Sequence, residues 1–169
     1  MRIGIVGGTG REGRGIAIRW AAAGHEVTIG SREASRGAEK AAELSAAHGV
    51  KLVGGDNVGA CRDAEIVLLS VPFSGHAETV RELAPVLAGK IVIDLTVPLK
   101  PPAVRTVNLP ESKAACLATQ EILGDAAKVV GALHHISSEH LTDPHHTIDC
   151  DVLVCGNDPE ARGIVVKLV

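Results

Sequence analysis

A glycine-rich segment near the N-terminus has the spacing of a phosphate-binding loop. Residues 8–13 match the pattern G-x-G-x-x-G and stand between a strand-like run and a helix-like one. In dinucleotide-binding proteins these glycines allow a tight turn, close approach of backbone to a pyrophosphate, and close helix packing, while the helix amides donate to the anion. A glycine-rich turn without a ligand is the alternative, but the order of strand, loop and helix favours a dinucleotide. The residues expected at the cofactor are Gly8, Thr9, Gly10, Arg11, Glu12 and Gly13.

The residues after the second predicted strand favour NADP over NAD. An NAD site usually has Asp or Glu about 20 residues after the loop to hold the ribose 2′-hydroxyl, whereas Ser31 and Arg32 stand here, with Arg36 one helical turn further on. A hydroxyl and two guanidinium groups can hold a 2′-phosphate through charge-assisted hydrogen bonds. The alternative, two solvated arginines at a helix start, is disfavoured by the helix dipole. We therefore expect all three residues at the 2′-phosphate.

A third group of candidates ends the strand expected beside the first one. Ser70, Val71 and Pro72 stand there, so their backbone is expected to border the dinucleotide where the strand order reverses. His76 begins the next predicted helix and could face a phosphate or cap that helix; for a single histidine the capping role is favoured.

Five of the eight histidines fall between residues 134 and 146, near several acidic residues and two cysteines. Imidazole and thiolate are favoured zinc ligands, but none of the usual zinc spacings occurs, so no metal site is predicted. The alternative is positional. His134, Ile136 and Ser138 follow a strand at its carboxyl end, where α/β sheets place ligands. Alternate residues of an extended segment point the same way, so these three are expected to line one wall of a substrate pocket.

No nucleophile beside a base and no usable pair of carboxylates occurs along the chain. Hydride transfer needs neither, because the cofactor carries the chemistry while the protein orients the reactants and excludes water. We therefore predict no catalytic residue in the acid–base or nucleophilic sense.

The elements that must position these residues form an alternating pattern. Short β-branched runs alternate with longer Ala-rich ones, which predicts an α/β fold: a doubly wound, mostly parallel Rossmann-type sheet with helices on both faces. The expected strands are Arg2–Val6, Glu26–Gly30, Glu65–Val71, Lys90–Thr96, Lys128–Leu133 and Asp151–Cys155, with a weaker one near Lys51–Val53. The expected helices are Arg11–Ala23, Arg32–His48, His76–Leu87, Ser112–Leu123 and Pro159–Leu168.

The domain organisation follows from the same pattern. Residues 1–133 are expected to form an NADP-binding Rossmann domain, and residues 134–169 a continuation packed on it that bears part of the second-substrate wall. The proline-rich stretch Pro98–Pro102 is expected as a loop crossing the edge of the sheet.

Composition narrows the classes of partner. The 169 residues include one Trp, one Phe and no Tyr, and the net charge is −3, so stacking platforms and a basic footprint for nucleic acid are missing. The apolar runs are too short for a membrane span, and no signal-peptide pattern opens the chain. Small-molecule partners and a cytoplasmic location are therefore expected. The four cysteines form no C-x-x-C pair and are expected as buried thiols.

Several of these motifs together resemble a known family, the coenzyme F420-dependent NADP oxidoreductases, also called NADPH-dependent F420 reductases. The resemblance covers the whole chain. The segments that carry it are Gly7–Gly10, Gly24–Arg32, Ser70–Pro72, Leu133–Ile136 and Cys150–Gly156.

The resemblance implies a reversible hydride transfer between C4 of the nicotinamide of NADP and C5 of the deazaflavin coenzyme F420, with the two rings stacked. Thr9 to Glu12 would wrap the pyrophosphate, with only the backbone of Arg11 and Glu12 carried over, since that pair is variable. His134 and Ile136 would contact the deazaflavin or press the rings together, and Ser138 would lie near the carboxamide.

The resemblance also implies a homodimer. Chains of the family continue past the position of Val169, in a segment that completes the deazaflavin wall and contributes to the dimer. We therefore expect residues 134–169 to be truncated relative to the family, as a fragment or as a natural short form with a more open second site.

Two other functions compete with this one. The first is an NADP-dependent reductase with another acceptor, such as a flavin, a metal or an imine, since the Rossmann subtype is shared by other reductases. The second is a module that binds NADP without turnover.

Overall fold

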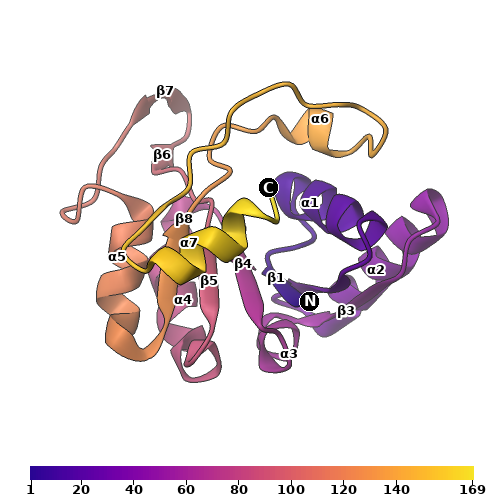
Figure 1. Ribbon diagram of the computed structural model, residues 1–169, viewed down its shortest axis with the longest axis horizontal. Coiled ribbons are helices and arrows are strands. Elements are labelled where there is room, and N and C mark those ends of the chain that lie inside the picture. The colour runs from indigo at the N-terminus through magenta and orange to yellow at the C-terminus, as the bar shows by residue number, and fades with distance from the viewer.

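The computed structural model describes residues 1–169, apart from the side chain of Ala103. Seven strands form one sheet in the order β3-β2-β1-β4-β5-β8-β9 (Figure 1). Every neighbouring pair is parallel except β8 and β9. The strands are β1 (Arg2–Val6), β2 (Glu26–Ser31), β3 (Leu52–Asp56), β4 (Ile66–Leu69), β5 (Ile91–Asp94), β8 (Lys128–Gly131) and β9 (Cys155–Gly156). The predicted doubly wound, mostly parallel sheet is thereby confirmed.

Helices cover both faces of this sheet. They are α1 (Arg11–Ala22), α2 (Ala34–His48), α3 (Asn57–Arg62), α4 (Phe73–Leu87), α5 (Ala115–Leu123), α6 (Ser138–Leu141) and α7 (Pro159–Val166), with a 3-10 turn η1 (Gly124–Ala126). One apolar cluster joins the sheet to α1, α2 and α7 and includes Ile16 and Val165. A second joins it to α3, α4 and α5 and includes Leu83 and Leu123. The all-apolar, fully buried strand β4 is typical of strands with helices on both sides.

Three helices, α2, α4 and α5, begin later or earlier than the sequence suggests; α5 begins at Ala115 and not at Ser112. α2 begins at Ala34 after the cap residue Glu33, so Arg32 lies in the connection that leads to it. α4 begins at Phe73, directly after Pro72, because proline has no amide to lose and is tolerated at a helix start. His76 therefore lies inside the first turn of α4, and the prediction that it caps this helix is wrong.

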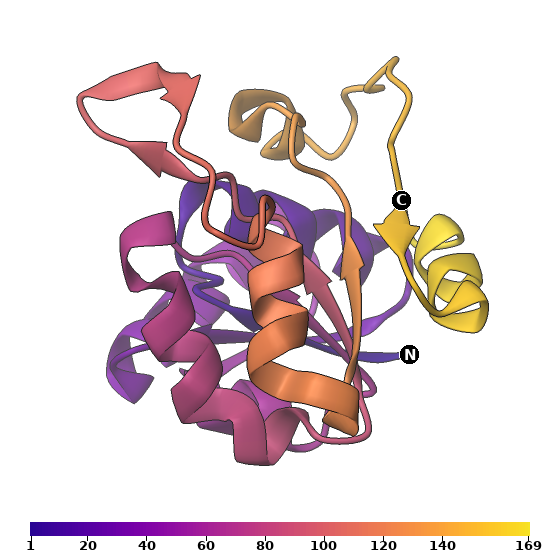
Figure 2. The same cartoon turned by 90° about the vertical axis from the view of Figure 1, so that its left-hand side faces the viewer.

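The chain beyond β5 departs most from expectation. Of the expected strand Asp151–Cys155 only Cys155 is in a strand, the two-residue β9, which runs antiparallel to β8. The expected loop Pro98–Pro102 is part of a hairpin, β6 (Leu99–Lys100) and β7 (Ala103–Val107), that forms a sheet of its own. Figure 2 shows this hairpin and the α6 segment beyond the same end of the large sheet.

Among the helices that the structure describes, none combines the length and the apolar character of a bilayer span.

Candidate functional site

The glycine loop, residues Gly7–Gly13, connects β1 to α1 with almost no room for side chains. A Cβ at Gly8 would lie 2.7 Å from the Cβ of Ile29 in β2, and one at Gly13 would lie 2.9 Å from the Cα of Gly8. The amide of Gly8 donates to the carbonyl of Gly30 at 2.9 Å, which holds the loop against β2. These approaches explain glycine at the first and last positions of the motif.

The N-terminus of α1 leaves backbone amides available to an anion. The amide of Arg14 donates to the carbonyl of Gly10 at 3.0 Å, and the cap residue Gly10 has no side chain to bind the amides before Arg14. Such amides point out of the helix end, where the helix dipole favours negative charge. The side chains of Arg11 and Glu12 are exposed, so the geometry offers their backbone for the contact.

The glycine loop meets the end of β4 where the order of strands reverses. A Cβ at Gly7 would lie 2.3 Å from the carbonyl oxygen of Ser70, and one at Gly13 would lie 3.2 Å from its Oγ. The same Cβ at Gly7 would lie 3.1 Å from Cγ1 of Val71, whereas Pro72 is exposed. Ser70 and Val71 therefore lie beside the glycine loop, at the edge where doubly wound sheets bind ligands.

Two arginines without carboxylate partners follow β2. Ser31 ends this strand and is 6% exposed, while Arg32 and Arg36 have exposed side chains. Among the described residues, neither arginine takes part in an ion pair. Cations close to the positive end of a helix are unfavourable unless an anion accompanies them. The arrangement fits a phosphate bound between the end of β2 and the start of α2.

The segment after β8 turns sharply instead of extending. Leu133 has a φ of +66°, the amide of Ile136 donates to the carbonyl of Leu133 at 3.4 Å, and α6 begins at Ser138. The side chains of this segment therefore do not alternate in direction as they would in an extended strand. The prediction that His134, Ile136 and Ser138 share one wall for that reason is wrong.

His134 and Ile136 instead line two different hollows beside this turn. The first, which we call the hairpin hollow, has a volume of about 530 Å³ and lies between the β6–β7 hairpin, α5 and the ends of β5 and β8. The second, the α1 hollow, has a volume of about 720 Å³. Residues lining the hairpin hollow include Thr96, Val97, Leu109, Cys116, His134 and Cys155. Residues lining the α1 hollow include Ile16, Trp20, Ile136, Leu141, Ile148 and Leu168.

Arg19 of α1 fastens the histidine-rich segment, residues 134–146, onto the sheet domain. Its guanidinium donates to four backbone carbonyls of that segment at distances of 2.6–3.2 Å. The acceptors are the carbonyl oxygens of His140, Leu141, Asp143 and His146. The helix that begins at the glycine loop therefore also holds the segment beside the two hollows.

A buried polar triad, His76, Asp94 and Thr119, lies under the hairpin hollow. These side chains are at most 1% exposed. Asp94 Oδ2 accepts from Thr119 Oγ1 at 2.7 Å and lies 2.8 Å from His76 Nε2, which is 2.9 Å from Thr119 Oγ1. Asp94 Oδ1 accepts from the amide of Thr96 at 2.9 Å. The triad therefore ties α4 and α5 to the turn after β5 that lines the hollow.

The electrostatics of the triad favour an ionised carboxylate. Burial alone would raise the pKa of Asp94, but the hydrogen bond and charge of His76 and the bonds from Thr119 and Thr96 outweigh it, so this pKa lies below its usual value. Burial also lowers the pKa of His134, although the Asp94 charge opposes the shift. A neutral imidazole therefore faces the hairpin hollow near neutral pH.

Sequence reasoning missed Arg19, Asp94, Thr96 and Thr119. A signal for Asp94 existed: it is the one charged residue that ends the apolar run from Ile91, and charged residues are almost never fully buried unless paired. Arg19 and Thr119 carry no such signal, since each lies at an ordinary helix position. The residues to which they are hydrogen-bonded lie 25 or more positions away in the sequence.

The expectation that all four cysteines are buried thiols holds fully for one of them. Cys61 is buried and Cys116 half-buried, whereas Cys150 and Cys155 are exposed. Within the described part of the chain, no three His, Cys, Asp or Glu side chains are grouped closely enough to hold a metal ion.

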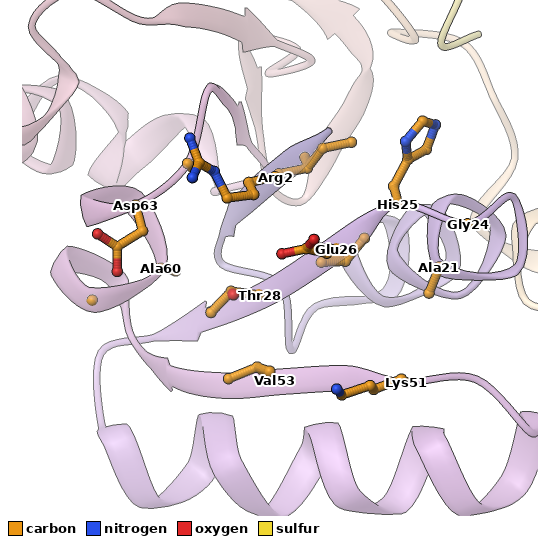
Figure 3. A pocket seen from close by; sticks show the side chains of 14 residues that line it. Arg2, Ala21, Gly24, His25, Glu26, Thr28, Lys51, Val53, Ala60 and Asp63 are labelled. Atoms are coloured by element: carbon orange, nitrogen blue, oxygen red, sulfur yellow. The ribbon is translucent and has the colours of Figure 1, made fainter.

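A further hollow lies at the opposite end of the sheet. Figure 3 shows it lined by charged side chains: Arg2, Glu26 and Lys51 lie near the starts of β1, β2 and β3, and Asp63 lies at the end of α3. Ligands of doubly wound sheets bind at the carboxyl ends of the strands, so this hollow is not part of the candidate site.

Comparisons with known proteins agree with this geometry. A family model described as "NADP oxidoreductase coenzyme F420-dependent" matches residues 2–98. The F420-dependent NADP reductase of Methanocaldococcus jannaschii is 36% identical, with 99% of this chain and 78% of the relative covered. That of Methanothermobacter marburgensis is 34% identical with the same coverage. A solved structure from Arthrobacter sp. FB24, named as a candidate F420-dependent NADP reductase, superimposes with a TM-score of 0.82 at 29% identity, covering 99% of this chain and 79% of that one.

Proposed function

Because this chain belongs to the family of coenzyme F420-dependent NADP oxidoreductases, we propose that it transfers a hydride reversibly between NADP(H) and coenzyme F420. The observation that carries the NADP half is the open N-terminus of α1 beside Arg32 and Arg36, two cations without carboxylate partners among the described residues. The F420 half rests on the relatives, whose names specify that coenzyme.

The glycine loop fits a pyrophosphate. Side chains at Gly8 and Gly13 would collide with β2 or with the loop itself, which keeps the backbone bare for the approach of a phosphate. The amides of Thr9 to Glu12 would hold the pyrophosphate, and Gly8, Gly10 and Gly13 would keep that surface clear. Ser31, Arg32 and Arg36 would hold the 2′-phosphate through charge-assisted hydrogen bonds.

The turn Ser70–Pro72 and the two hollows supply the remaining surfaces. Bound NADPH supplies a hydride from C4 of its nicotinamide, and C5 of the deazaflavin accepts it. Ser70, Val71 and Pro72 would border the nicotinamide. His134, Ile136 and Ser138 would contact the deazaflavin or the carboxamide from the turn after β8.

This chain's own contribution is binding, orientation and exclusion of water. The reaction requires no covalent nucleophile, and the buried Asp94 carboxylate already has His76 and Thr119 as its partners. The neutral imidazole of His134 can hydrogen-bond a polar edge of the acceptor without adding charge. We therefore assign no acid–base catalyst.

We propose that the partners are small molecules and not nucleic acids. One Trp and one Phe offer few aromatic rings on which bases could stack, and a net charge of −3 does not attract phosphates. The homodimer and the cytoplasmic location remain predictions.

The test mixes the reduced protein with NADPH and oxidised coenzyme F420 and follows the visible absorbance of the deazaflavin. The proposal predicts bleaching at a rate proportional to protein concentration. Parallel mixtures with a free flavin, a ferric chelate and a cyclic imine should show no NADPH oxidation. Oxidation of NADPH by one of these and not by F420 would establish the other-acceptor function. Saturable NADP binding with no acceptor reduced would establish a binding module.

A further inference from the structure

Two cysteines from distant parts of the chain lie on one face of the sheet at its edge. In the antiparallel ladder between β8 and β9, Cys155 is paired directly with Gly131. Side chains of directly opposed residues emerge on the same face with their Cβ atoms roughly 4.5–5.5 Å apart. The side chain of Cys155 therefore projects beside the position that the Cβ atom of residue 131 would occupy if that residue were not glycine.

Gly131 has no side chain at this position, and the side chain of Cys116 in α5 packs against it. A Cβ at Gly131 would lie 3.0 Å from Cys116 Sγ and 3.3 Å from Cys116 Cβ. The Cys116 sulfur thus lies in contact with the position from which a cross-strand neighbour of Cys155 would project. Disulfides require Cβ atoms about 3.5–4.5 Å apart, a separation within reach of side chains that meet across one ladder position.

The surroundings agree with this proximity. Both cysteines line the hairpin hollow. The pKa of Cys116 is raised chiefly by burial and then by the charge of Asp94, and Cys155 contributes to the same direction. Two thiols influence each other's ionisation only when they are close.

The exposures of the two thiols differ in a way that sets an order of reaction. Cys155 is exposed and Cys116 is half-buried. A small oxidant therefore reaches Cys155 first. Cys116, whose raised pKa keeps it mostly as the unreactive neutral thiol, is held next to the oxidised Cys155.

We propose that Cys116 and Cys155 form a reversible disulfide across Gly131, at the wall of the hairpin hollow, in exchange with a low-molecular-weight disulfide. The Cys155 thiolate attacks one sulfur of the small disulfide, forms a mixed disulfide and releases one small thiolate. The Cys116 thiolate then attacks the Cys155 sulfur and releases the second. Two protein thiols lose two electrons, the small disulfide gains them, and the two protons end on the two small thiols.

The new bond would join α5 to β9 beside His134, whose Cε1 lies 3.2 Å from the same Gly131 position. It would narrow the hairpin hollow, one of the two hollows that we propose as surfaces for the acceptor, while the glycine loop and Arg32 lie in the connections after β1 and β2. This consequence rests on the proposed function, whereas formation of the bond does not.

The test incubates the reduced full-length chain with excess cystamine, counts free thiols, and maps cross-linked peptides after digestion with trypsin and an Asp-specific protease. The proposal predicts loss of three of the four thiols: the exposed Cys150 becomes a mixed disulfide with cysteamine, and the other two form a cross-link between the peptide with Cys116 and the peptide with Cys155. Dithiothreitol should reverse both changes. Cleavage before Asp151 separates Cys150 from Cys155, so the assignment is unambiguous.

Matched variants sharpen the result. Cys61→Ser and Cys150→Ser should form the cross-link like the wild type, Cys116→Ser should stop at the mixed disulfide on Cys155, and Cys155→Ser should form neither. Gly131→Ala, which places a methyl 3.0 Å from the Cys116 sulfur, should slow closure severalfold. A wild-type chain that stops at the mixed disulfide, or a cross-link that persists in Cys155→Ser, would overturn the proposal. Because thiols and peptides are measured, these results do not depend on whether F420 is the acceptor.

Discussion

The two sides of the proposed site are built in different ways. The NADP side, comprising the glycine loop, Ser31, Arg32 and Arg36, comes from two consecutive strand-to-helix connections, and its form is set by backbone packed on backbone. The acceptor side, comprising the hairpin hollow and the histidine-rich segment, is assembled from the ends of β5 and β8, a hairpin and a loop. Long-range side-chain bonds such as those of Arg19 hold that segment.

This difference indicates how each side tolerates change. On the NADP side Gly7, Gly8 and Gly13 cannot be replaced without displacing their surroundings, because a Cβ atom at any of these positions would come within 3 Å of a neighbouring atom. On the acceptor side a few polar side chains fix whole segments, so single side-chain deletions should loosen it while leaving the NADP side in place. Variants on each side can test that contrast, and the buried triad of His76, Asp94 and Thr119 should be the most sensitive.

Asp94→Ala should have the largest effect. It leaves His76 and Thr119 buried without their acceptor and frees the amide of Thr96, and each buried polar group that loses its hydrogen-bond partner costs about 1–3 kcal/mol. Urea denaturation of wild type and variant measures the free energy of unfolding. The matched control, Asp125→Ala on the surface, should cost under about 0.5 kcal/mol; an equal loss in both variants would show that the triad adds no stability.

The double variant Arg32→Ala with Arg36→Ala should weaken NADP binding roughly 10–100-fold, since a hydrogen bond to a charged group contributes about 1.5–3 kcal/mol. NAD binding should stay unchanged, because NAD lacks the 2′-phosphate that these residues would hold. Titration calorimetry with both dinucleotides provides the measurement, and Arg105→Ala on the hairpin is the control. If NADP and NAD weaken to the same degree, the 2′-phosphate site is assigned wrongly.

Arg19→Met should act on the acceptor side alone. The four carbonyls of the histidine-rich segment lose their donor, so we expect faster hydrogen exchange at residues 140–146 and a KM for the acceptor raised about threefold to tenfold, equivalent to roughly 1 kcal/mol. The dissociation constant of NADP should be that of the wild type. Faster hydrogen exchange confined to α1 would contradict the role of Arg19 in holding the histidine-rich segment. Arg81→Met on α4 is the control.

The smallest effect concerns His134 and pH. The pKa of this imidazole is lowered in the folded chain, chiefly by burial, so the unfolded chain takes up the proton first as pH falls. The stability that neutral His134 contributes is therefore present above its ordinary pKa of 6.5 and is lost as pH falls through the lowered value. The unfolding free energy of wild type relative to His134→Asn should shrink between about pH 8 and about pH 5. A difference independent of pH would refute this assignment.

The NADP side was readable from the sequence because its determinants are local. The motif from Gly8 to Gly13, and the replacement of an acid by Ser31 and Arg32, lie within a few residues of the strands that precede them. Apolar runs such as β4 predicted the parallel sheet for the same reason, since a strand covered on both faces has to be apolar throughout.

The acceptor side could not be read in this way. The positive φ of Leu133 redirects His134 and Ile136 into different hollows, and no local rule predicts a left-handed leucine. The antiparallel pairing of β8 and β9 joins residues more than 20 positions apart in the sequence. The hydrogen bonds of Arg19 join residues more than 100 positions apart. Such contacts depend on the folded arrangement rather than on spacing.

The central claim, direct hydride transfer from NADPH to coenzyme F420, is tested most directly by isotope transfer. NADPH carrying two deuterium atoms at C4 is mixed with the protein and oxidised F420 in ordinary water, and the reduced deazaflavin is analysed by mass spectrometry after a single turnover. The account predicts one deuterium in the reduced deazaflavin. Reduced deazaflavin that carries only solvent hydrogen, or NADPH that is never consumed, would contradict it.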